Sequence, residues 1–128
     1  MAEKQLGEEE LMQDDVDDAL MMDDFKENGA KFSTVEATDI STLMRKVVYS
    51  THRVPNTTTI VATATLKLGE HNFTLVHQHT ACTDPRNFNE EKGINYAILK
   101  ASKAAREKLW ELEGYLMFKQ LSSAQEGE

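Results

Sequence analysis

Residues 57–68 read TTTIVATATLKL, and the alternation of side chains along this stretch decides the fold class of the chain. Polar and apolar side chains alternate here with a period of two, which is typical of a β-strand with one buried face. The face expected to be buried carries Ile60, Ala62, Ala64, Leu66 and Leu68. The opposite face carries Val61, Thr63, Thr65 and Lys67.

Two further strands are expected around this one. Residues 69–72 (GEHN) form a plausible hairpin turn, and a second strand should run from Phe73 to about Ala81. Residues 47–49 (VVY) suggest a third strand, which Pro55 separates from residues 57–68 because proline cannot continue a central ladder.

Helical patterns flank the strands on both sides. Residues 38–46 (TDISTLMRK) predict a short helix capped by Thr38 or Asp39. A long helix is expected from about residue 89 to 113, because Asn87 and Glu90 have the spacing of an N-cap with its capping-box partner. The apolar stripe of the long helix would consist of Ile94, Ala97, Ile98, Ala101, Ala104, Ala105, Leu109 and Leu112.

Gly114 is the expected end of the long helix, with a short helix over residues 115–121 and a disordered tail over residues 122–128. Residues 31–121 are therefore expected to form one α+β domain, in which a small antiparallel sheet packs on a long C-terminal helix. A domain of this size buries a small core, so we expect the chain to form an oligomer.

The negative charge of the chain is concentrated in residues 1–30. The 128 residues carry a net charge of −8. Residues 1–30 hold eleven acidic and two basic residues (−9), and residues 31–128 hold eleven acidic and twelve basic ones (+1). Two interpretations of this acidic arm stay open: a solvated arm that is disordered or partly helical, and a helix that docks on a partner or mimics a nucleic-acid backbone.

Composition and motifs disfavour several classes of protein. No apolar run approaches the roughly 18 residues of a membrane span, and the N-terminus lacks the pattern of a secretory leader. A single cysteine, Cys82, excludes an internal disulfide and a zinc site made of cysteines alone. The acidic balance disfavours direct nucleic-acid binding.

We expect neither a metal site nor catalysis. His71, His77, His79 and Cys82 are close in sequence but match no zinc template. Cys82 and His79 lack a third group to orient them as a nucleophile and base. The chain also lacks Gly-rich phosphate loops and the known hydrolase motifs, so we expect a protein without cofactor that is not an enzyme.

Residues 82–89 (CTDPRNFN) join the second hairpin strand to the long helix and combine groups that suit a nucleotide. Free N–H groups at a helix start favour an anion, and Arg86 can contact a phosphate. Phe88 offers a ring on which a base can stack, while Asn87 and Asn89 can read a base edge or a ribose hydroxyl. The alternative is that Phe88 packs as a hydrophobic staple and that Arg86 is solvated.

Four segments, in this order, resemble a family of small tailed-phage proteins. They are HRVPNTT (52–58), TLKLG (65–69), TACTDPRNFNEEKG (80–93) and AAREKLWELEGYLMFKQL (104–121). The match covers about residues 38–121 and leaves the acidic arm outside. The pattern is also similar to that of the first type of Thoeris anti-defence proteins. That resemblance implies a small β-sheet with C-terminal helices, assembled as a dimer and in some members as a hexamer.

The same resemblance implies a ligand and a set of site residues. Thoeris anti-defence proteins of this type sequester the cyclised ADP-ribose signal of bacterial TIR enzymes without cleaving it. Carried over by position, Phe88 would stack on adenine. The remaining pocket residues would be Thr83, Asp84, Arg86, Asn87, Asn95, Tyr96 and Arg106. After Gly93 the chain reads INYAILKASKAA, where relatives place a basic residue and then an asparagine, so the polar contacts of this helix differ here.

We therefore expect a phage anti-defence protein, acting in the cytoplasm of the infected bacterium, that binds and sequesters a cyclic nucleotide signal. The ligand would be a cyclic ADP-ribose isomer or a cyclic oligonucleotide, and the protein a homo-oligomer, either a dimer or a hexamer. No membrane or nucleic-acid partner is expected. The alternative is a protein-interaction inhibitor, or a nucleic-acid mimic, that acts on a host defence enzyme through the acidic arm.

Overall fold

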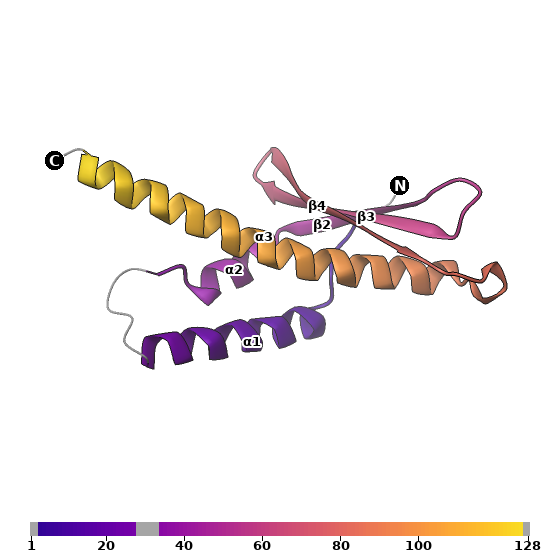
Figure 1. Cartoon of the computed structure of the whole chain (residues 1–128), viewed down its shortest axis with the longest axis horizontal. Helices are drawn as coiled ribbons and strands as arrows, with labels where there is room; N and C mark the ends of the chain where they lie inside the picture. Colours follow the sequence, from indigo (N-terminus) through magenta and orange to yellow (C-terminus); the bar gives the residue numbers. More distant parts are fainter. Residues whose placement is uncertain (1–2, 28–33, 127–128) are drawn as a thin grey trace.

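The computed structural model describes residues 3–27 and 34–126 and confirms the expected α+β class. One antiparallel sheet with the strand order β1-β2-β3-β4 packs against a long C-terminal helix, α3. In Figure 1 the sheet lies above α3, and helices α1 and α2 lie below it. The elements are β1 (Glu3–Lys4), α1 (Glu8–Glu27), α2 (Ala37–Met44), β2 (Val47–Arg53), β3 (Thr59–Leu68), β4 (His71–Ala81), the 3₁₀ turn η1 (Pro85–Asn87) and α3 (Glu90–Glu126).

Strand β3 shows the expected alternation. Its side chains Ile60, Ala62, Ala64 and Leu66 are buried, whereas those between them are half-buried. Leu68 is 45% exposed, contrary to expectation, because it stands at the last position before the turn. The turn itself has only two residues: Leu68 pairs with His71, and Gly69 adopts φ +61°. A positive φ at the first turn residue is the requirement of a type II′ hairpin, and glycine meets it without strain.

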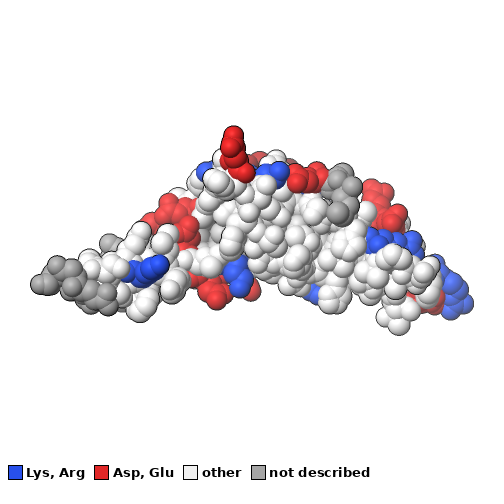
Figure 2. Space-filling view, turned by 90° about the horizontal axis from the view of Figure 1, so that it is seen from above, with Lys and Arg blue, Asp and Glu red and all other residues white. Residues whose placement is uncertain are grey.

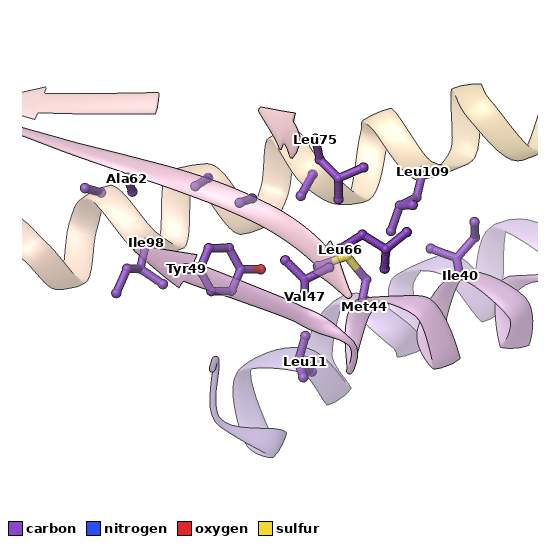
Figure 3. Packing of buried hydrophobic residues seen from close by; sticks show 14 of the residues in the cluster. Leu11, Ile40, Met44, Val47, Tyr49, Ala62, Leu66, Leu75, Ile98 and Leu109 are labelled. Atoms are coloured by element: carbon purple, nitrogen blue, oxygen red, sulfur yellow. The ribbon is translucent and has the colours of Figure 1, made fainter. Parts of the chain in front are cut away.

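The hydrophobic core lies between the sheet and α3 (Figure 3). Strand β4 contributes Leu75, which has no partner in β3 because the register shifts by one residue at that point. Helix α1 adds one buried side chain to this cluster, Leu11. The core residues on α3 are Ala97, Ile98, Ala101, Ala105 and Leu109, which confirms most of the expected apolar stripe.

Strand β2 is the expected third strand, and a fourth strand was not expected. In β1, Glu3 pairs with Ser50 and Lys4 with Tyr49 of β2. Two charged residues carry no apolar alternation, so nothing in their sequence indicates a strand. The sheet therefore begins in the segment that we expected to be an arm.

The cap of α2 differs from the prediction. Glu36 is the N-cap, with extended backbone angles (φ −92°, ψ 140°) and no side-chain cap bond. Its carbonyl oxygen accepts hydrogen bonds from the N–H groups of Asp39 (3.0 Å) and Ile40 (3.4 Å). Thr38 and Asp39 consequently lie inside the helix instead of capping it.

The start of α3 also differs from the prediction. Asn87 belongs to η1 and does not pair with Glu90 as a capping box. The cap is Asn89, whose Oδ1 accepts a hydrogen bond from the N–H of Lys92 (3.1 Å). Asn87 stands three residues before Glu90, and Asn89 stands three residues before Lys92, so the sequence spacing allows either asparagine to cap the helix. The turn at Pro85 includes Asn87 and leaves Asn89 as the cap of α3.

Gly114 does not end α3, which continues to Glu126 through the residues expected to form a short helix and a tail. A glycine inside a helix costs only about 1 kcal/mol relative to alanine, and the good helix formers around it outweigh this cost. The part of α3 after Gly114 extends past the sheet in Figure 1.

Candidate functional site: the junction between β4 and α3

A short capped turn leads from the end of β4 to the start of α3. The Asp84 carboxylate accepts a hydrogen bond from the N–H of Arg86 (3.0 Å) and caps η1, whose first residue is Pro85. The Arg86 side chain folds back onto the same carboxylate, with Nη2 at 2.7 Å from Oδ2. These hydrogen bonds lower the pKa of Asp84. The turn thereby fixes the backbone that precedes Phe88.

A hollow of about 270 Å³ lies at this junction. It opens between the start of β3, the end of β4 and the first turns of α3. Its lining residues are Thr58, Thr80, Ala81, Cys82, Asn87, Phe88, Asn89, Lys92, Gly93 and Tyr96. We call it the junction pocket.

Gly93 allows α3 to approach the sheet at the junction pocket. A Cβ at this position would lie 3.2 Å from Cγ1 of Ile60 and 3.7 Å from Cε2 of Phe88. The Thr80 hydroxyl donates a hydrogen bond to the Gly93 carbonyl (3.2 Å) and ties β4 to the first turn of α3. Phe88 is half-buried and packs against the core at its edge.

Arg53, at the end of β2, covers part of the Phe88 ring. Its guanidinium carbon lies 4.4 Å from the ring centroid, which is cation–π geometry. The Nε of Arg53 also donates a hydrogen bond to the carbonyl oxygen of Thr57 (2.7 Å). The interaction brings a cation to the edge of the junction pocket from a strand 35 positions earlier in the chain.

Of the site residues inferred from the sequence, Asn87, Phe88 and Tyr96 line the junction pocket. Thr83, Asp84 and Arg86 belong to the same junction without lining it. Asn95 lies on another face of α3 and lines a separate hollow with residues 4–6. Arg106 is buried against α1, where it meets the carboxylates of Asp15 and Asp18.

Sequence reasoning missed several lining residues. Thr58 directly precedes β3 and Thr80 lies near the end of β4, and only the pairing of these two strands brings the two residues to the same end of the sheet. Asn89, predicted from the sequence as a group that can read a base, lines the pocket, whereas Lys92 on the first turn of α3 was not among the inferred site residues. Arg53 lies in the HRVPNTT segment, which carries part of the family resemblance, but this segment gave no indication that Arg53 contacts Phe88.

The lining groups suit a ligand with a planar ring and several polar atoms. Two aromatic side chains, Phe88 and Tyr96, can stack on a base. Lys92 can pair with a phosphate, and the amides of Asn87 and Asn89 can donate and accept hydrogen bonds. Among residues 3–27 and 34–126 no group of three or more His, Cys, Asp or Glu side chains could hold a metal ion.

The face seen in Figure 2 shows no broad basic surface. Lys and Arg side chains lie singly or in small groups, with Asp and Glu beside most of them, and the middle of the face is largely uncharged. A nucleic-acid backbone is bound by an extended basic surface, which this face does not offer. No helix in the described part of the chain is long and apolar enough to cross a membrane.

The fold defines a small α+β domain, and the junction pocket is a hollow at its strand-to-helix turn. Residues 35–121 match the model of the phage protein (N4 Gp49/phage Sf6 gene 66) family, and the chain belongs to this family. The matched range contains the whole junction pocket and leaves β1 and α1 outside. No curated protein matches the chain, and no solved structure matches it either.

Proposed function

We propose that this phage protein binds a cyclic nucleotide signal in the junction pocket and sequesters it without cleaving it, as an anti-defence protein. The observation that carries this proposal is the pairing of two aromatic rings, Phe88 and Tyr96, with the cation of Lys92 in one hollow. A ring binds a base by stacking, and a cation binds a phosphate. The ligand class follows the resemblance to Thoeris anti-defence proteins.

The size of the junction pocket favours a site completed by a second copy of the chain. Its volume of about 270 Å³ is below the ~300–1,000 Å³ of typical small-molecule sites. Large apolar side chains are exposed on the C-terminal part of α3, namely Leu112, Tyr115, Leu116, Phe118 and Leu121. Such an exposed patch is typical of a protein interface.

Binding without turnover agrees with the chemistry of the pocket. The pocket lining includes the thiol of Cys82, whose Sγ donates a hydrogen bond to the Asp84 carbonyl oxygen at 3.0 Å. No histidine or carboxylate of the described chain lines the pocket to act as a general base for it. The proposal therefore assigns the pocket binding alone.

Calorimetric titration of the pure protein with cyclic ADP-ribose isomers and a panel of cyclic di- and trinucleotides tests the proposal. One ligand should bind tightly and be recovered intact after the protein is denatured. Phe88→Ala should weaken binding about tenfold to a hundredfold, the effect of losing one base-stacking ring (~1–3 kcal/mol). Tyr96→Ala should also weaken binding, and because Tyr96 is 63% exposed its removal spares the core.

Phe73→Ala is the matched control, because Phe73 is a 56% exposed phenylalanine on β4 outside the junction pocket. It should bind as the unmodified chain does. Equal losses in Phe73→Ala and Phe88→Ala, or cleavage of the bound ligand, would contradict the proposal.

A second candidate function is inhibition of a host protein through α1. This helix turns apolar residues outward at helical spacing: Met12, Val16 and Leu20 are each at least half exposed. The acidic residues Glu9, Asp17 and Asp23 are exposed on the same helix and would match a basic partner surface. Absence of binding across the ligand panel would favour this second function over the first.

A further inference from the structure

Two arginines of the family-matched region are neutralised by carboxylates from outside it. Arg45 follows α2, and Arg106 lies in the middle of α3; both fall within residues 35–121. All of their carboxylate partners belong to α1, which precedes the matched range. Helix α1 thus supplies the carboxylates that pair with two arginines of the family-matched residues 35–121.

Arg106 is the more deeply buried of the two, with a side chain that is 7% exposed. Its Nη1 donates hydrogen bonds to Asp15 (3.0 Å) and to Asp18 (2.9 Å). Arg45 lies beside it with a side chain that is 32% exposed. Its Nη2 donates hydrogen bonds to both Asp15 and Glu8, each at 2.8 Å, and its Nε donates a second hydrogen bond to Glu8 at 2.9 Å. The two guanidinium groups therefore converge on one carboxylate.

The carboxylates of α1 do not satisfy all the donors around Arg106. Its Nε has no hydrogen-bond partner and has Asp14 only at 3.9 Å. The hydroxyls of Tyr49 and Ser102 are also buried, on residues 1% and 2% exposed, and neither has a hydrogen-bond partner beyond the other. Burial raises the pKa of Tyr49, while a hydrogen bond with Ser102 and the charge of Arg106 oppose this rise.

Buried polar groups without a partner are rare in folded proteins. Here one of them is the Nε of Arg106 itself, and Ser102 stands one helical turn before it on α3. A carboxylate offers two oxygens in one plane, whereas a phosphate offers more acceptor oxygens arranged in three dimensions. Arginine pairs readily with either group. The donor set around Arg106 is thus larger than the carboxylates of α1 can satisfy.

We propose that Arg45 and Arg106, with the hydroxyls of Tyr49 and Ser102, form a second anion-binding site for a ligand that carries phosphate groups. In the structure, α1 fills this site with its own carboxylates, mainly Asp15. The ligand competes with α1 and displaces its acidic face from the two arginines. The site is separate from the junction pocket and does not depend on the function proposed for that pocket.

The apolar contacts of α1 agree with a helix that can be displaced. Only Leu11 and Met22 among its apolar side chains are buried. The remaining large apolar side chains, Met12, Val16, Leu20, Met21 and Phe25, are exposed. The ion pairs to Arg45 and Arg106, together with these two buried side chains, therefore hold α1 on the domain.

Trp110 makes the displacement measurable. It is the single tryptophan of the chain, and its Nε1 donates a hydrogen bond to Asp18 at 3.2 Å. The full-length chain is titrated with sodium tripolyphosphate at constant ionic strength, and binding is followed by Trp110 emission and by calorimetry. Tripolyphosphate is used as the probe because it carries phosphate groups without a base.

Asp15→Asn/Asp18→Asn removes two charges from the acidic face of α1 without changing side-chain shape. It should bind tripolyphosphate at least tenfold more tightly than the unmodified chain. Asp17→Asn/Asp23→Asn is the matched control, because it removes the same charge from exposed positions of the same helix that contact neither arginine. It should bind no more than twofold more tightly.

Two further variants locate the site. Arg45→Gln, added to Asp15→Asn/Asp18→Asn, should abolish the gain. Phe88→Ala, added to the same variant, should leave tripolyphosphate binding unchanged. Three outcomes would overturn the proposal and leave the arginines a structural role alone. The first is equal binding of tripolyphosphate by Asp15→Asn/Asp18→Asn and Asp17→Asn/Asp23→Asn. The others are absence of binding to Asp15→Asn/Asp18→Asn and loss of binding when Phe88→Ala is added to it.

Discussion

At the scale of single residues, Gly93 is the point where the core and the junction pocket meet. Ile60, which a Cβ at this position would approach to 3.2 Å, is 1% exposed and has no space into which to move. We expect Gly93→Ala to lower the free energy of unfolding by about 1–2 kcal/mol, because overpacking outweighs the gain in helix propensity. Urea unfolding followed by circular dichroism measures the change.

Gly114 is the matched control on the same helix. A Cβ there meets nothing within 4 Å, so only helix propensity changes. Gly114→Ala should raise the free energy of unfolding by about 0.5–1 kcal/mol. If Gly93→Ala and Gly114→Ala change the free energy of unfolding in the same direction, the close approach of α3 to β3 at Gly93 does not contribute measurably to stability.

Individual site residues were predictable where their chemistry depends on neighbours in sequence. Phe88 and Asn87 follow a strand and a turn that the sequence marks clearly, and both line the junction pocket. Arg106 was assigned to that pocket as well, yet its partners are carboxylates 88 and 91 positions away. A helical arginine has the same local pattern whether it faces a ligand or a distant acidic helix.

At the scale of elements, α1 is a helix attached through its acidic face. Burial disfavours the ionised form of Asp15, but hydrogen bonds from Arg45 and Arg106 outweigh this effect and lower its pKa. A carboxylate whose pKa is lower in the folded state stabilises the fold above its unfolded pKa, about 3.9. That contribution is lost as the pH falls from about 4 through the lower, folded pKa.

The free energy of unfolding should therefore fall more steeply below about pH 4 in the unmodified chain than in Asp15→Asn, which has no such proton to bind. Urea unfolding at several pH values between 3 and 7, at constant ionic strength, measures both profiles. Asp17→Asn serves as the control, because Asp17 is exposed and contacts neither arginine. Its profile should follow that of the unmodified chain, and parallel profiles for all three proteins would exclude the ion pairs of Asp15 as a source of acid sensitivity.

Elements were predictable where a periodic pattern extends over many residues. The alternation in β3 and the apolar stripe of α3 both lie where expected, because burial on one face imposes the period. Element ends were predicted less well. The cap of α2, the start of α3 and the passage of α3 through Gly114 each depend on differences of about 1 kcal/mol, which tertiary contacts readily override. The strand β1 has no pattern of its own and depends on pairing with β2.

At the scale of the whole molecule, we expect two copies of the chain to assemble. Two features favour this expectation, the exposed apolar end of α3 and the small volume of the junction pocket. The volume of the pocket, about 270 Å³, is below the ~300–1,000 Å³ of typical small-molecule sites, and the apolar end of α3 has no partner within the described part of the chain. A second copy would cover the apolar end of α3 and bring additional side chains to the ligand.

We therefore expect the full-length chain to be a dimer by size-exclusion chromatography with light scattering. Phe118→Glu/Leu121→Glu should give a monomer that binds the ligand at least tenfold more weakly, although neither residue lines the junction pocket. Leu20→Glu, which adds the same kind of charge to an exposed apolar position of α1, should remain a dimer with unchanged affinity. A monomeric variant with full affinity would separate assembly from binding and place the whole ligand within one chain. A dimer lost through Leu20→Glu would instead assign the contact between copies to the outward face of α1.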